Sequence, residues 1–102
     1  MSSLKDLSRE RPDYHRRKFR VPIRLIEATV DPSTRRSQVI FEFSGLTFRL
    51  LISPVRKVQG VDFAFEVQPV GHDLDMESCE RLAAELYLHR PPEIFSVVDQ
   101  LR

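Results

Sequence analysis

The sequence VIFEFSGLTFRLLI occupies residues 39–52 and decides the fold class of this chain. Apolar residues alternate with polar or smaller ones on both sides of Ser44-Gly45, which is the pattern of two strands joined by a two-residue turn. Cross-strand apolar pairs stabilise a sheet, so we expect this hairpin to be a core element. Antiparallel pairing across the turn predicts three such pairs on one face: Phe43 with Leu46, Phe41 with Phe48, and Val39 with Leu50.

Strand patterns continue on both sides of the hairpin. In residues 20–30 the apolar phase changes near Leu25-Ile26, which predicts a β-bulge. Pro22 cannot donate to a β-ladder, so this strand should lie at a sheet edge or begin irregularly. The remaining segments of this region are interpreted as a turn at residues 31–34, a basic loop at residues 54–60 and a strand at residues 61–67.

The sequence after residue 71 has helical periodicity. Asp73 or Asp75 can cap a helix, whose apolar stripe comprises Met76, Cys79, Leu82, Ala83 and Leu86. Pro91 ends this helix, and Pro92 can begin a second short helix with an apolar side formed by Ile94, Phe95, Val98 and Leu101. The predicted fold class is mainly β, either a β-barrel or a strongly twisted antiparallel sheet, with C-terminal α-helices.

The length of 102 residues is enough for one compact domain and too small for two. Residues 1–14 are polar and weakly patterned, so we expect a flexible N-terminal arm followed by a single domain over residues 15–102. One cysteine and no secretory signal pattern favour a cytoplasmic location. No apolar run has the length of a membrane span. The oligomeric state stays open.

Positive charge is concentrated near the N-terminus. Six of the twelve residues 9–20 are Arg or Lys, although the formal net charge of the whole chain is only +1. Closely spaced guanidinium groups repel one another unless phosphates, carboxylates or planar bases meet them. The pattern is therefore that of a solvated basic tail or of an anion-binding segment.

The sequence RRKFRVP at residues 16–22 resembles the Arg-x-x-x-Arg motif that leads into the first strand of PilZ domains. The order of the expected elements is also similar, and GVDFAF at residues 60–65 resembles the family's late Gly-Val-x-Phe strand. PilZ domains are small bacterial β-barrels with a C-terminal helix, and their ligand is the second messenger cyclic di-GMP. The family's second motif, Asp or Asn-x-Ser-x-x-Gly, has its nearest match in EFSG at residues 42–45, where Glu replaces Asp and glycine directly follows serine.

The resemblance implies a small non-enzymatic adaptor domain. Arg16 and Arg20, or Arg17 in the alternative register, are expected to contact the phosphates and guanine edges of cyclic di-GMP, with Ser44 as a further contact. Binding would order the basic arm and create a surface for a partner protein. The resemblance implies no other cofactor.

Two alternative functions remain open. The basic residues could neutralise nucleic-acid phosphates while Tyr14 and Phe19 stack on bases, as in a nucleic-acid-binding module. Alternatively, the chain could be a ligand-free protein-interaction domain, because some PilZ members that lack the ligand motif act purely through protein contacts.

The sequence pattern does not favour an enzyme or a metal site. His15, His72 and His89 are far apart and form no recognisable triad. Cys79 lies on the expected apolar stripe, so we interpret it as a buried structural residue. The acidic residues near positions 73–77 have the ordinary chemistry of a helix start.

Overall fold

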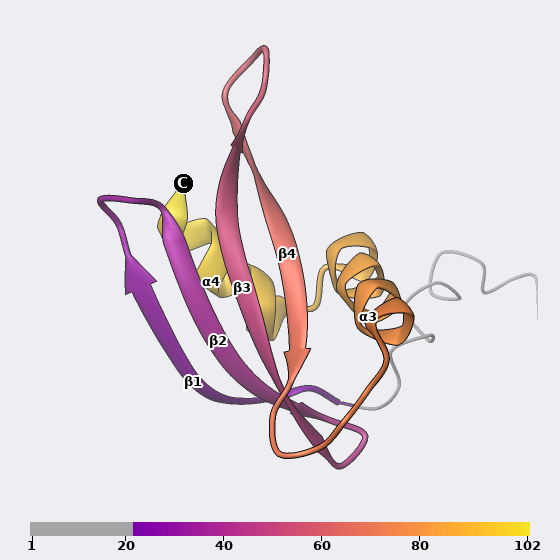
Figure 1. Ribbon diagram of the computed structural model, residues 1–102. Coiled ribbons are helices and arrows are strands. Elements are labelled where there is room, and N and C mark those ends of the chain that lie inside the picture. The colour runs from indigo at the N-terminus through magenta and orange to yellow at the C-terminus, as the bar shows by residue number, and fades with distance from the viewer. Residues whose placement is uncertain (1–21) are drawn as a thin grey trace, which may run out of the picture.

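The computed structural model describes residues 22–102. The expected arm at residues 1–14 and the tract containing Arg16, Arg17 and Arg20 lie outside these described residues. Within the described part, the elements are β1 (Arg24–Asp31), β2 (Arg36–Phe43), β3 (Leu46–Arg56), β4 (Val61–Pro69), α3 (Met76–His89) and α4 (Pro92–Leu101). The strands form an antiparallel sheet in the order β1-β2-β3-β4, and the two helices follow it (Figure 1). The predicted β-rich fold with C-terminal helices is confirmed.

The β2–β3 hairpin has the register that its alternating pattern predicts. Phe43 pairs with Leu46, and the pairing continues through Phe41 with Phe48 to Val39 with Leu50. Ser44 and Gly45 both have positive φ angles, 54° and 78°, which is the backbone of a type I′ turn. This turn matches the twist of the strands, and the inner side chains of the hairpin are part of the core.

The predicted bulge in β1 and the turn after it are both confirmed. The β1–β2 register shifts between Leu25 and Glu27. After β1, the Asp31 carboxylate accepts hydrogen bonds from the Ser33 backbone N–H at 3.1 Å and from the Ser33 hydroxyl at 2.7 Å. These bonds form a local Asx-type turn. Pro22 precedes β1, which is an edge strand of the described sheet.

The prediction of a basic loop over residues 54–60 is wrong, because β3 continues to Arg56 and Pro54 pairs with Phe63 of β4. Pairing between β2 and β3 ends at Ile52, so the side of β3 that faces β2 is open at Pro54. A proline without an N–H is tolerated there. The connecting turn closes with the Lys57 backbone N–H donating to the Gly60 carbonyl at 3.2 Å.

The two helices cover the core from the same side of the sheet. Asp75 is the N-cap of α3, and its carboxylate accepts hydrogen bonds from the Ser78 N–H at 3.0 Å and the Ser78 hydroxyl at 2.7 Å. The predicted apolar stripe of α3 is correct except for Met76, which is 75 % exposed. The apolar side of α4 is buried against β1 and β2, whereas α3 lies beside β4 (Figure 1).

Candidate ligand-binding site

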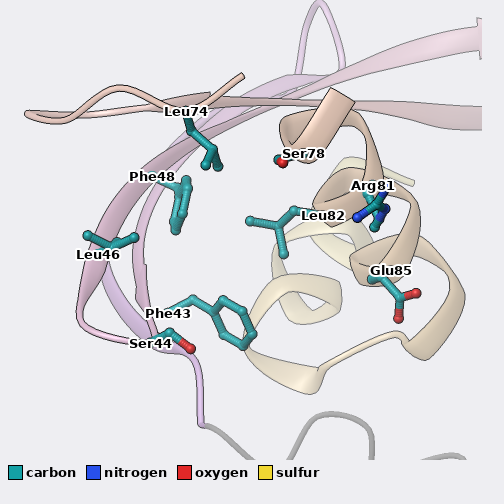
Figure 2. A pocket seen from close by; sticks show the side chains of 9 residues that line it. All are labelled: Phe43, Ser44, Leu46, Phe48, Leu74, Ser78, Arg81, Leu82 and Glu85. Carbon is teal, nitrogen blue, oxygen red and sulfur yellow. The ribbon is translucent and has the colours of Figure 1, made fainter. Parts of the chain in front are cut away.

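Ser44 is the predicted ligand contact that lies within the described residues, and it borders a cavity of about 340 Å³ between the β2–β3 turn and α3. Figure 2 shows the Phe43 and Leu82 side chains directed toward this cavity from opposite sides. We call this cavity the turn cavity. Its lining residues are Phe43, Ser44, Leu46, Phe48, Leu74, Ser78, Arg81, Leu82 and Glu85. The combination of aromatic rings, aliphatic groups and a few polar side chains suits a flat, partly apolar ligand.

The sheet side of the turn cavity is held in place by packed rings. Phe48 is 3 % exposed and stacks on Phe41 with ring centroids 5.6 Å apart. His72 contacts Phe48 edge to face at 5.1 Å, and its Nε2 lies 2.9 Å from the Thr47 carbonyl oxygen. A carbonyl oxygen can only accept, so this contact requires a proton on His72 Nε2. His72 therefore connects the loop after β4 to the hairpin.

Residues on one face of α3 form the opposite wall of the turn cavity. Ser78, Arg81, Leu82 and Glu85 follow one another at helical spacing, which brings them to the same side. Arg81 Nη2 lies 3.4 Å from Glu77 Oε2, and both side chains are largely exposed, so this ion pair leaves the guanidinium accessible. Sequence reasoning did not single out Arg81. The spacing of Arg81 with Ser78 and Glu85 places the three residues on one face of the helix. This spacing indicates a binding site only when that face is known to lie opposite the hairpin turn.

The start of β1 lies at the same end of the sheet as Ser44. Arg24 pairs with Glu42 in the β1–β2 register, and Glu42 is two residues before Ser44. Arg24 Nε donates to Glu42 Oε1 at 3.0 Å. Glu42 is therefore engaged in an ion pair within the protein. Arg20 precedes Arg24 by four residues in the sequence.

A second polar cluster joins β4 to α3. The Tyr87 hydroxyl lies 2.8 Å and 2.7 Å from the two carboxylate oxygens of Asp62, and Lys57 Nζ lies 3.3 Å from Asp62 Oδ2. The hydrogen bond from Tyr87, followed by that from the Phe63 N–H, lowers the pKa of Asp62. The same contact, followed by burial, raises the pKa of Tyr87. The cluster thus favours a charged carboxylate and a protonated phenol.

Cys79 has the environment of a structural residue and not of a reactive one. Cys79 is buried, as predicted, and burial raises the pKa of its thiol, which disfavours the reactive thiolate. Within residues 22–102, no three His, Cys, Asp or Glu side chains gather in a way that could hold a metal ion. No helix in this described range has the length and apolar character required to cross a membrane.

Comparisons with known proteins returned no match: no protein-family model fits the chain, and neither the curated proteins nor the solved structures searched gave a significant similarity.

Proposed function

We propose that this chain is a non-enzymatic binding and adaptor domain that holds cyclic di-GMP between its basic tract and the turn cavity and passes the signal to a partner protein. The observation that carries the proposal is the β1–β2 register, since it brings the residues directly after the basic tract to the sheet end that contains Ser44. Residues distant in sequence can then act on one ligand.

The chemistry of the turn cavity supports a nucleotide with planar bases. Phe43 contributes a half-buried aromatic ring to the lining above the buried Phe48, and Arg81 lies at the rim as an accessible guanidinium. In this proposal Arg16 and Arg20 bind the phosphates, and the exposed Ser44 hydroxyl contributes a weaker hydrogen bond. Arg17 takes the place of Arg16 in the alternative register.

Calorimetric titration of the whole chain with cyclic di-GMP tests the proposal. We expect saturable binding by the wild type and at least about a 100-fold weaker affinity for the double variant Arg16→Ala/Arg20→Ala, because each lost charge-assisted hydrogen bond is worth about 1.5–3 kcal/mol. The melting temperature should change little. The matched control is Arg36→Ala/Arg56→Ala, which removes two positive charges from the start of β2 and the end of β3, at the opposite end of the sheet.

The nucleic-acid alternative predicts a different titration. A mixed oligonucleotide would then bind with an affinity that falls steeply as salt is raised, because neutralised phosphates release counterions. Such binding without saturable binding of cyclic di-GMP would contradict the proposal. Equal affinity for the nucleotide in the wild type and in Arg16→Ala/Arg20→Ala would contradict the assignment of the arginines.

A further inference from the structure

The outer edge of β4 has main-chain groups that the sheet does not use. Pro54 and Pro69 have no N–H, and they occur in the pairs Pro54 with Phe63 and Phe48 with Pro69. Such pairs must be of the non-hydrogen-bonded class, so Phe63 and every second residue along β4 direct their N–H and C=O groups away from β3. The Phe63 N–H is satisfied by Asp62 Oδ1 at 2.8 Å. The outward N–H and C=O groups of Phe65 and Val67 form no hydrogen bond with another group of the described residues.

A groove runs beside this free edge. Two adjoining hollows of about 540 and 630 Å³ lie between β4 and α3, and they share Phe65, Glu80 and Ala83. Their walls are largely apolar, and α3 lies beside β4 in Figure 1. We call the outer edge of β4 and these two hollows together the β4 groove. Leu74 is the one described residue that its lining shares with the turn cavity.

Two large apolar side chains along the β4 groove are unusually exposed. Met76 is 75 % exposed and Leu88 is 69 % exposed. They occur on α3 with Glu80 and Ala84 between them at four-residue steps, so the four side chains follow one side of the helix. The core does not use Met76 or Leu88, and exposed apolar groups next to a free strand edge are typical of a docking surface.

The charge of the β4 groove favours a basic occupant. Glu66 and Glu80 lie on its rim, and neither carboxylate has a Lys or Arg partner among residues 22–102. One register of pairing with a second copy is disfavoured. Antiparallel pairing of two β4 strands centred on Ala64 would set each Glu66 opposite the Asp62 of the other copy, and like charges in opposed positions destabilise a sheet.

We propose that the β4 groove binds an extended segment of a partner protein in which apolar residues alternate with Lys or Arg. The segment adds as a further strand, with main-chain hydrogen bonds to Phe65 and Val67. Its apolar side chains face α3 and contact Met76 and Leu88. Its basic side chains lie on the other face of the added strand beside Glu66, and Glu80 adds negative charge on the α3 side.

The probe for this proposal is the fluorescein-labelled peptide Thr-Lys-Val-Lys-Val-Lys-Val-Thr, and its binding is measured by fluorescence anisotropy with the whole chain. A peptide with Glu in place of every Lys tests the charge, and a peptide with N-methylated valines tests the main-chain bonds. We expect both to bind at least about 10-fold more weakly than the lysine peptide, since each loses several polar contacts. The variant Glu66→Lys/Glu80→Lys should reverse the preference between the lysine and glutamate peptides.

Glu93→Lys on the exposed start of α4 is the matched control and should leave the affinity unchanged. Amide hydrogen exchange provides a second measurement, because the Phe65 and Val67 N–H groups should become protected when the lysine peptide binds.

The proposal is overturned if both charged peptides bind equally or not at all. It is also overturned if those two amides are already protected without peptide, or if sedimentation shows that the wild type is a dimer held together through this edge. Arg16→Ala/Arg20→Ala should bind the lysine peptide like the wild type, so the two proposals can fail separately.

Discussion

The contact between Tyr87 and Asp62 has several structural roles. It ties α3 to β4, it satisfies the carboxylate that also binds the Phe63 N–H, and it positions Tyr87 against the rings of Phe65 and Phe95. The Asp62 side chain is 30 % exposed, so water weakens the electrostatic part of this contact. We therefore expect a moderate contribution to stability from the hydrogen bond and the ring packing together.

Tyr87→Phe should lower the free energy of unfolding at pH 7 by about 1 kcal/mol, because the ring packing is kept while the hydrogen bond to the carboxylate is lost. Chemical denaturation of the wild type and the variant measures this difference. In the background Asp62→Asn the same change should cost clearly less, since the charged acceptor is already absent. An equal cost in both backgrounds would show that the hydrogen bond is not the stabilising contact.

The two shifted pKa values also predict how stability depends on pH. The pKa of Asp62 is lowered on folding, so its contribution is present above the ordinary aspartate value of about 3.9 and is lost as pH falls through the lowered pKa. The pKa of Tyr87 is raised on folding, so its contribution is present below about 10 and is lost as pH rises through the raised pKa. Tyr87→Phe should accordingly flatten the alkaline decline in melting temperature, and an unchanged decline would contradict this assignment.

Among the elements, α3 depends on its first turn because it forms a wall of both the turn cavity and the β4 groove. The Asp75 carboxylate satisfies a backbone N–H that the helix itself cannot pair, and it also holds the Ser78 hydroxyl. Hydrogen bonds from Ser78 lower the pKa of Asp75, in agreement with a charged cap. The position of Ser78 in the lining of the turn cavity links this cap to the candidate site.

Asp75→Ala should destabilise the domain by about 1 kcal/mol, the usual cost of losing a side-chain N-cap. The matched control is Asp73→Ala, which removes the other residue that the sequence allowed as a cap and is exposed. We expect that control to stay within about 0.5 kcal/mol of the wild type. Thermal unfolding followed by circular dichroism compares the two, and a larger effect of Asp73→Ala would contradict the assigned cap.

At the scale of the whole molecule, the last element completes the core that the first strands begin. Leu101 in the final turn of α4 is 2 % exposed, and α4 packs on β1 and β2. Leu101→Ala should therefore cost about 2–5 kcal/mol, as for other buried leucines. Leu88→Ala makes the same chemical change on an exposed surface and should cost less than about 0.5 kcal/mol. Denaturant titration measures the free energy of unfolding of both variants, and similar losses in the two would contradict this prediction.

Local patterns predicted the hairpin register, the β1 bulge, the end of α3 and the start of α4 because short-range rules control each of them. The length of β3 was missed because its proline is tolerated only where β2 has already ended, and this depends on three strands at once. Ser44 was proposed from the sequence, but Arg81 was not, because their proximity arises from the packing of α3 beside the hairpin. The assignments of Arg16, Arg17 and Arg20 remain predictions outside the described residues.

The packing of α4 on the first strands has a consequence for biosynthesis. Each strand of the meander can pair with its predecessor as the chain leaves the ribosome, but the final helix is still in the exit tunnel at that stage. The hydrophobic side of β1 and β2 then stays uncovered until α4 has emerged. Stable folding of this domain should consequently wait for α4, and the nascent chain is a natural client for chaperones that shield apolar surface.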